Sequence, residues 1–171
     1  ELARGAFASD PSVYLAKTLE GDIYSAQSST LTRSGDWDGA LALLDKAGEC
    51  YAVALEVARS DPHLHGKELA RLRRMLNIQL SFRQEADEVF QGGLDIGEKG
   101  LVIDPDNFDL HLNLFSLLFT FSNDQAFGGR DVMAYFEKAV GLIKRAKELK
   151  PDHHLVDIKL GYTFLQMGIS A

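Results

Sequence analysis

The chain has 171 residues, of which 46% are hydrophobic and four are proline, so it is long and apolar enough for one domain with its own core. Its formal net charge of −7 argues against general nucleic-acid binding, because neutralising phosphates takes a surplus of Lys and Arg. The single cysteine, Cys50, excludes an intrachain disulfide and is expected to be a small buried hydrophobe. No apolar run approaches the roughly 18 residues that span a bilayer, so we expect no membrane span in this segment. We expect a cytoplasmic location, with a removed signal or anchor as the alternative.

The N-terminal part of the chain predicts two helices joined by a tight turn. Apolar residues recur at three- and four-residue spacing from Pro11 to about Ser34, which is the period of an amphipathic helix. A turn follows at 35–39, and a second helix returns until Asp61-Pro62 stops it. Within residues 1–10 we expect the end of an earlier helix.

The middle of the chain predicts a second helical pair. One helix is expected from about His65, and a turn near Arg83-Gln84 separates it from a returning helix that ends at 104–107. The returning helix carries four glycines, although each glycine costs a helix roughly 1 kcal/mol relative to alanine. Three of the four share one helical face, which predicts close approach by a neighbouring backbone: Gly93, Gly97 and Gly100.

A third helical pair and a single last helix complete the chain. Residues 108–121 are apolar nearly all round, so their helix is expected at the centre of the core. A connection at 122–131 leads into a returning helix that Lys150-Pro151-Asp152 stops, and a last amphipathic helix follows at about 155–167. No stretch alternates with the two-residue period of a β-strand, so the predicted fold class is all-α.

The helix-ending prolines recur at nearly constant intervals. Pro62, Pro105 and Pro151 are separated by 43 and 46 residues, with two helices in each interval. This period is typical of a solenoid of antiparallel helical hairpins. We therefore expect a single domain over 1–171, a piece of a longer chain, with these units: about 11–62, 63–105 and 106–151, and a half unit at 152–171.

The residues at repeated positions resemble the tetratricopeptide repeat over nearly the whole chain from Pro11. The turn and second helix of that repeat are matched by Gly35, Trp37, Ala40, Leu44 and Ala47. Its first helix is matched by Leu160, Gly161, Phe164 and Gly168, and its closing element by 101–107 and 149–152. The resemblance implies a right-handed superhelical array of antiparallel helical hairpins.

The departure from the family is the length of the repeat. The family repeat has about 34 residues, and the units here are nine to twelve residues longer. In the first unit, the family-like Gly21 and Tyr24 lie about seven residues further from Gly35 than the family predicts. Seven residues make two helical turns at about 3.6 residues per turn, so such an insertion lengthens a helix without rotating its apolar face.

A narrower resemblance is to repeat arrays found C-terminal to some bacterial Ser/Thr protein kinases. It rests on the long units, the ARSDPHLH stop and the GGRD connection. The sequence has none of the kinase motifs: no Gly-rich phosphate loop followed by lysine, no His-Arg-Asp and no Asp-Phe-Gly. A kinase would therefore have to lie elsewhere in a parent chain.

Candidate chemical sites in the sequence favour structural interpretations. His63 and His65 would form a metal pair with Glu68, but they stand at a helix start, where polar residues are expected anyway. Residues 104–109 lack the glycine and the acidic last residue of a calcium loop, and 128–130 is not followed by the Gly-Lys-Ser/Thr of a phosphate loop. We expect no catalytic residue, cofactor or metal in this segment.

Basic residues cluster in the third helix, at Lys67, Arg71, Arg73 and Arg74. They cover several faces of the helix, so the cluster is interpreted as solvated surface, with a patch for an acidic partner as the alternative.

The family resemblance implies a concave face, lined by the first helix of each unit, that commonly accepts a peptide. Carried over residue by residue, the inward positions include Thr18, Asp22, Ser25, Asp109, Asn113, Ser116, Lys159 and Tyr162. Leu112 and Ile158 fall on the same face, and packing explains them equally well. Only Asn113 and Lys159 match the Lys/Asn/Arg clamp with which some family members hold a C-terminal carboxylate.

These patterns favour a non-catalytic scaffold of the tetratricopeptide type that binds a protein or peptide and no nucleic acid. The alternatives are a regulatory segment of a bacterial Ser/Thr kinase and a small-ligand or transporter-associated helical carrier. A carrier would need an apolar cavity lined by the 115–121 segment. The apolar stripe of the last helix, which has no returning partner, predicts pairing with a missing segment, a neighbouring chain in a homo-oligomer, or the N-terminal helix.

Overall fold

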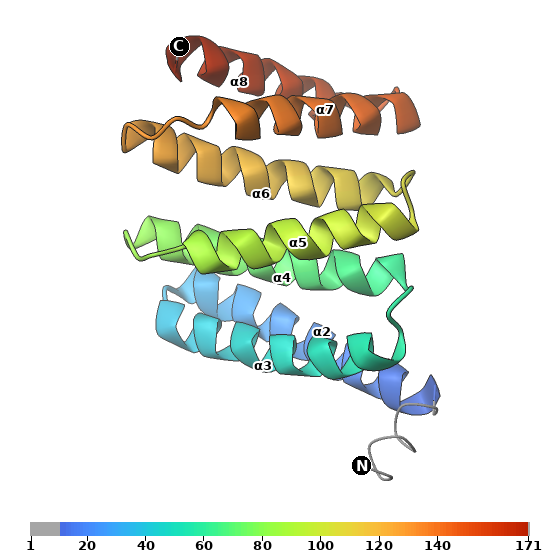
Figure 1. Ribbon diagram of the computed structural model, residues 1–171. Helices are drawn as coiled ribbons and strands as arrows, with labels where there is room; N and C mark the ends of the chain where they lie inside the picture. Colours follow the sequence, from blue (N-terminus) through green and yellow to red (C-terminus); the bar gives the residue numbers. More distant parts are fainter. Residues whose placement is uncertain (1–10, 171) are drawn as a thin grey trace.

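The computed structural model describes residues 11–170, in which seven α-helices stack from one end of the molecule to the other (Figure 1). The expected helix within residues 1–10 lies outside the described residues. The described part contains no β-strand, which confirms the all-α prediction. The helices are α2 (Pro11–Ser34), α3 (Trp37–Val57), α4 (Pro62–Ser81), α5 (Asp87–Ile103), α6 (Phe108–Phe127), α7 (Met133–Leu149) and α8 (His154–Ser170).

Side-chain caps determine where several helices begin. The carboxylates of Asp36 and Asp61 and the amide oxygen of Asn107 each accept a hydrogen bond from a backbone N–H in the first turn of α3, α4 and α6. Because Asp61 caps α4, Pro62 is the first residue of that helix, where its missing N–H costs nothing. The expectation that α4 begins near His65 was therefore wrong by three residues.

The repeat is more regular than the prolines indicate. The helices α4, α6 and α8 begin at Pro62, Phe108 and His154, which are 46 residues apart in both intervals. Pro62 lies inside its helix, whereas Pro105 and Pro151 each lie three residues before theirs, and this offset produces the shorter spacing of 43.

The connections that follow α4 and α6 differ in how well the sequence predicts them. The turn expected near Arg83-Gln84 is confirmed: α4 ends at Ser81, and Arg83 has a positive φ of 55° that breaks the helix. The connection expected over 122–131 is shorter, because α6 continues to Phe127 and Gly128-Gly129 is the first sequence that ends it.

The helix α6 lies at the centre of the main core, as its all-round apolar sequence predicts. Its side chains Leu114, Phe115, Leu117 and Leu118 are almost fully buried. They pack against residues of α4, α5 and α7 in one continuous cluster. The core of the array is thus built around this helix, with units on either side of it.

The glycine face of α5 is filled by leucine side chains of α6, whereas the sequence predicted close approach by a neighbouring backbone. A Cβ atom added at any of the three glycines would lie within 3 Å of a leucine side chain on α6. The distances are 2.9 Å from Gly93 to Leu117, 2.8 Å from Gly97 to Leu114 and 2.9 Å from Gly100 to Leu110. The glycines therefore lower the helix propensity of α5, and in return they make room for the leucine side chains of α6.

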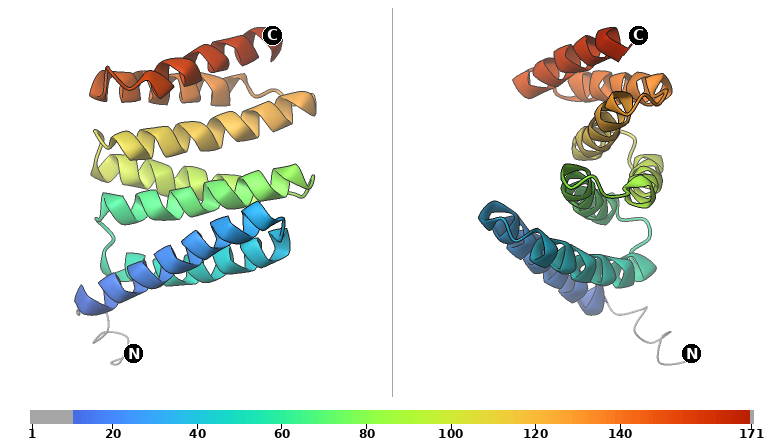
Figure 2. Two further views of the ribbon diagram at one scale, coloured as in Figure 1. Left: turned by 180° about the vertical axis from the view of Figure 1, so that it is seen from behind. Right: turned by 90° about the vertical axis from the view of Figure 1, so that its left-hand side faces the viewer.

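The first helices of the units lie against one another on one side of the array. Contacts join the first helices of successive units: α2 to α4, α4 to α6 and α6 to α8. The second helices α3, α5 and α7 contact first helices and do not form a continuous row of contacts with one another. The side view shows α4, α6 and α8 displaced from α5 and α7 (Figure 2). The array therefore has an inner face formed by α2, α4, α6 and α8.

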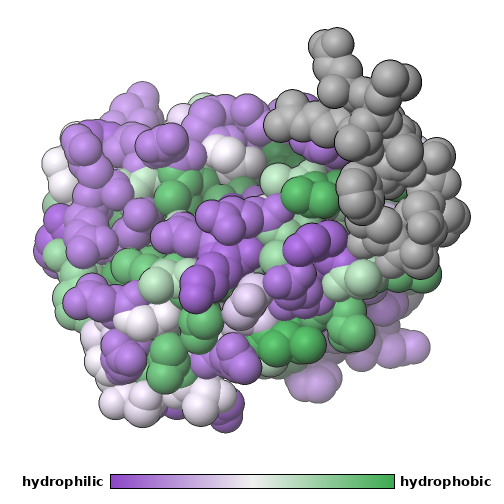
Figure 3. Space-filling model, turned by 90° about the horizontal axis from the view of Figure 1, so that it is seen from below, coloured by the Kyte–Doolittle hydropathy of each residue, from purple (hydrophilic) through white to green (hydrophobic). Residues whose placement is uncertain are grey.

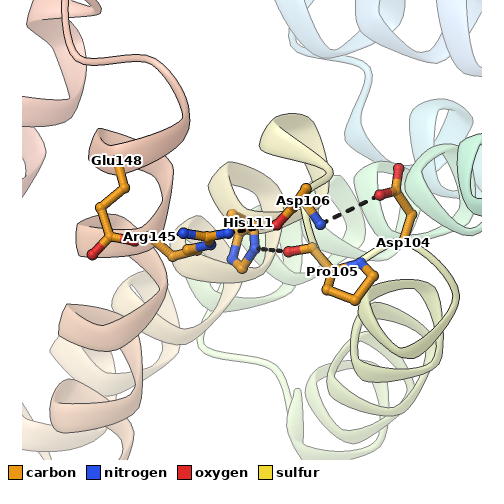
Figure 4. A network of polar contacts seen from close by, with 6 residues as sticks. All are labelled: Asp104, Pro105, Asp106, His111, Arg145 and Glu148. Atoms are coloured by element: carbon orange, nitrogen blue, oxygen red, sulfur yellow. Dashed lines mark hydrogen bonds and ion pairs between the residues drawn. The ribbon is translucent and has the colours of Figure 1, made fainter.

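Polar contacts tie the loop before α6 to the next unit (Figure 4). Arg145 of α7 donates to the carboxylates of Asp106 at 2.6 Å and Glu148 at 2.6 Å. The buried ring of His111 is hydrogen-bonded through Nε2 to the carbonyl of Pro105 at 2.8 Å. The Arg145–Asp106 contact thus joins α7 to the 104–107 loop, and the His111–Pro105 contact joins α6 to it.

Candidate functional site

The α2 end of the inner face is internally paired. The carboxylate of Asp22 accepts a hydrogen bond from the Tyr51 hydroxyl at 2.8 Å and forms an ion pair with Lys67 at 2.5 Å. The carbonyl of Ser25 accepts from Arg74 at 3.0 Å, and the Thr18 hydroxyl donates to a carbonyl of its own helix. The predicted residues Thr18, Asp22 and Ser25 are therefore present on α2 with their polar groups already engaged.

The ring of Tyr51 reaches this face because α2 has a glycine opposite it. A Cβ at Gly21 would lie 2.5 Å from the Cε1 atom of Tyr51. Burial raises the pKa of the Tyr51 hydroxyl, with its hydrogen bond to Asp22 acting in the same direction, so Tyr51 stays a proton donor. This contact joins α2 and α3 in the first unit.

The α8 end of the face is different, because its predicted cation has no acidic partner. The Lys159 ammonium lies 3.4 Å from the Ser116 hydroxyl of α6 and 5.3 Å from the centre of the Phe115 ring. Burial and the positive charge of nearby Arg73 lower the pKa of Lys159. The structure thus brings together the predicted residues Ser116 and Lys159.

The remaining predicted residues lie on α6 and α8. Asn113 is half-buried on α6, and Asp109 is exposed one helical turn before it. Tyr162, one turn after Lys159 on α8, is exposed. None of these three side chains forms a hydrogen bond, ion pair or aromatic contact with another predicted residue.

Arg73 adds a second unpaired cation to this end of the face. Its side chain is half-buried on α4, its buried Nε atom has no hydrogen-bond partner, and none of the described acidic groups forms an ion pair with it. Burial and the charge of Arg74 lower the pKa of Arg73. The α4–α8 end of the face thus carries two half-buried cations without a counter-charge among the described acidic groups.

The interpretation of the basic cluster on α4 as solvated surface was wrong. Arg71 is buried and bound to Glu68 at 2.6 and 2.7 Å, Lys67 is paired with Asp22, and Arg73 and Arg74 are half-buried. The spacing of 46 residues makes Lys67 equivalent in register to Asn113 and Lys159. Prolines 43 residues apart hid that register.

The inner face is hollowed between α2 and α4. One pocket of about 190 Å³ lies beside Asp22, Tyr51 and Lys67, and another of about 300 Å³ lies beside Trp37 and Asn77. Arg74 lines both pockets. The hollows lie on the same face as the predicted residues of α2.

Other chemical features of the described residues are structural. Cys50 is buried, and burial raises the pKa of its thiol, which disfavours the reactive thiolate. Within 11–170, no group of three His, Cys, Asp or Glu side chains is arranged to hold a metal ion. Among the helices α2 to α8, none is both long enough and apolar enough to cross a membrane.

These features define the molecule as an array of antiparallel helical hairpins with a polar inner face. No protein-family model matches the sequence, and no curated protein matches it. Solved structures of tetratricopeptide-repeat (TPR) domains match its fold, so the chain has the TPR fold that its motifs predict.

Two of these structures show the extent of the similarity. The first TPR of Spaghetti (RPAP3), bound to the HSP90 peptide SRMEEVD, has a TM-score of 0.57 at 11% identity, over 88% of this chain and 98% of that one. The Arabidopsis OM64 TPR domain has a TM-score of 0.54 at 12% identity, over 86% of this chain and 96% of that one. At these identities the similarity concerns the fold. The narrower resemblance to kinase-linked arrays stays a prediction.

Proposed function

We propose that this chain is a non-catalytic scaffold that binds a protein segment along the inner face of α2, α4, α6 and α8. The observation that carries the proposal is the pair of half-buried cations, Arg73 and Lys159, without an acidic partner. An anionic group from a ligand would supply the missing counter-charge and gain charge-assisted hydrogen bonds.

The proposed ligand is an extended peptide with acidic side chains or a C-terminal carboxylate. Its anionic end lies at Arg73 and Lys159, where Asn113 and Ser116 offer further hydrogen bonds. Its other end runs towards α2, whose acidic Asp22 is already neutralised by Lys67. The similarly folded Spaghetti domain is bound to a peptide whose sequence ends in EEVD, which supports an acidic ligand as the first probe.

The test is a fluorescence-polarisation titration with a labelled SRMEEVD peptide and an analogue in which each acidic group is replaced by its amide. We expect the acidic peptide to bind and the amide analogue to bind at least tenfold more weakly. Arg73→Ala and Lys159→Ala should each weaken binding by roughly tenfold or more, because each removes a charged hydrogen-bond donor. Lys144→Ala, on the exposed surface of α7, removes the same charge elsewhere and is the matched control.

Equal affinity for both peptides would reject the anionic ligand, and binding that both inner-face variants leave unchanged would reject the inner face. A pull-down from the source cell with Asn113→Ala and Lys159→Ala then tests the natural partner in the same way.

The carrier alternative has no structural support. Phe115, Leu117 and Leu118 are packed in the core, with at most 1% of each exposed. A cavity of about 370 Å³ beside this helix includes Phe121 as its only residue from the 115–121 segment, and its lining also includes Asp87, Arg130 and Asp131. The apolar cavity that a carrier needs is therefore not formed by the 115–121 segment.

A further inference from the structure

The last helix, α8, is covered on one side only. Val156 and Thr163 are fully buried where α8 packs against α7 and α6. In Figure 1, α8 is the last helix of the stack that the described residues form. The rest of its surface carries large apolar side chains that are 48–59% exposed: Leu155, Ile158, Tyr162, Phe164 and Leu165.

A comparison with α2 shows what this surface lacks. In both helices a glycine is followed three residues later by an aromatic residue, as Gly21 by Tyr24 and Gly161 by Phe164. At Gly21 the space is filled by the Tyr51 ring of the returning helix, 2.5 Å from the Cβ position. At Gly161, and at Gly168 two turns on, no atom lies within 4 Å of that position. The surface of α8 therefore has unfilled space at Gly161, large enough for an aromatic ring, beside the exposed ring of Phe164.

We propose that α8 pairs with α8 of a second copy of this chain, antiparallel about a two-fold axis. Phe164 of each copy then packs against Gly161 of the other. Phe164 and Gly161 lie one turn apart on one face of α8. The same surface therefore offers both the ring and the space that receives it, which is the self-complementarity that a two-fold interface requires. The same register brings Asp157 of one copy opposite Gly168 of the other, where a glycine leaves room for it.

Charge and dipole favour this arrangement. From Ile158 to Gly168 the only charged residue is Lys159, which is turned to the inner face beside Ser116, and Asp157 at the edge of this surface is already paired with Lys147 at 2.7 Å. Pairing the exposed side of α8 therefore buries few polar groups and has a small desolvation cost. Antiparallel helices also place opposite ends of their dipoles together.

The other end of the array offers a less suitable surface. Apolar side chains appear among polar ones in the view from the α2–α3 end (Figure 3), and Leu15, Leu19 and Ile23 of α2 are 49–61% exposed. The space at Gly21 of α2 is already filled by Tyr51, so this glycine cannot receive the ring of Phe164. A head-to-tail contact would also leave free ends and grow beyond two copies.

The test is sedimentation equilibrium of the 171-residue chain over a wide range of concentration. We expect a reversible dimer of the 18.9 kDa chain. Gly161→Leu should give monomers, because the leucine occupies the place of the partner's Phe164. Gly141→Leu on α7 is the matched control, since its Cβ position is also empty and both variants gain helix propensity. Circular dichroism verifies that both variants keep their helices.

A pair of complementary variants tests the contact itself. Gly161→Phe alone and Phe164→Gly alone should each be monomeric, because each breaks the match twice in a homodimer. Their mixture should form a heterodimer, in which every glycine faces a phenylalanine. A wild-type monomer at all concentrations, a Gly161→Leu dimer as strong as that of Gly141→Leu, a mixture without heterodimer, or species larger than a dimer would each overturn the proposal.

Discussion

Arg71 of α4 lies directly over Gly48 of α3, and this contact joins the first two units. A Cβ at position 48 would lie 2.7 Å from the Cζ atom of the guanidinium. The guanidinium has no freedom to withdraw, because it donates to both Glu68 oxygens at 2.6 and 2.7 Å and to the carbonyl of Leu44 at 3.2 Å. The glycine at position 48 is thus required by a charged group that α4 presents to α3.

The first prediction concerns this contact. Gly48→Ala should lower the free energy of unfolding by about 1–3 kcal/mol, because the new methyl group displaces a buried ion pair. Helix propensity alone would raise it by about 1 kcal/mol. Gly141→Ala, in an exposed and uncrowded position, should show that gain. Urea unfolding followed by circular dichroism measures both, and stabilisation by Gly48→Ala would contradict the contact.

The second prediction compares two glycines of α5. Gly97→Ala should destabilise the fold by about 1–3 kcal/mol, because its Cβ meets Leu114 at 2.8 Å and Leu69 at 3.2 Å, on two different helices. Gly92→Ala, whose Cβ has only Leu72 at 3.8 Å, should stabilise it by up to about 1 kcal/mol. The same denaturation experiment distinguishes them, and shifts of the same sign would show that packing does not explain the glycine face.

The outcomes along the chain show what sequence can and cannot determine here. The glycine face of α5 and the all-round apolar α6 were predictable, because each pattern belongs to one helix and has one physical explanation. The extension of α6 to Phe127 was missed because Ser122 to Ala126 is polar without being helix-breaking. Polarity was mistaken there for the end of a helix, and the first true breaker is Gly128-Gly129.

The cations of α4 illustrate a second limit. Whether an arginine is solvated or buried depends on the helix that faces it, and one helix's own sequence does not contain that information. Arg71 is buried because α3 presents Gly48 to it. Arg73 lacks a counter-charge because none of the described acidic residues forms an ion pair with it. The assignment of Asn113 and Lys159 to clamp positions rests on the family motif and stays a prediction.

The third prediction separates a helix cap from surface ion pairs. Asn107→Ala should cost about 1 kcal/mol, because Asn107 accepts from the Leu110 N–H at 3.0 Å and begins the central helix α6. Arg145→Ala removes two exposed pairs, with Asp106 and Glu148, and should cost less than about half of that. Thermal unfolding at low and at high salt measures both. Only the Arg145 effect should fall with salt, and an Arg145 effect larger than that of Asn107 would contradict this ranking.

The last prediction concerns the stability that Lys159 costs the free protein. The pKa of Lys159 is lowered in the folded state by burial and by Arg73, whereas an unfolded lysine titrates near about 10.4. The folded state therefore disfavours the protonated form, and Lys159→Met should raise the free energy of unfolding at neutral pH. Because the half-exposed ammonium is screened by solvent, the gain should be at most about 0.5 kcal/mol.

The sign of its pH dependence follows from the same shift. The advantage of Lys159→Met over wild type is complete below the lowered folded pKa, and it should shrink as the pH rises from there towards the unfolded value, because the wild-type group then loses its unfavourable charge. Urea unfolding of both proteins across this alkaline range measures the difference, and other alkaline titrations cancel between them. Lys144→Met, at an exposed position of α7, is the matched control for the substitution itself. A gain that stays constant with pH would mean that packing of the methionine, and not removal of a buried charge, stabilises the variant.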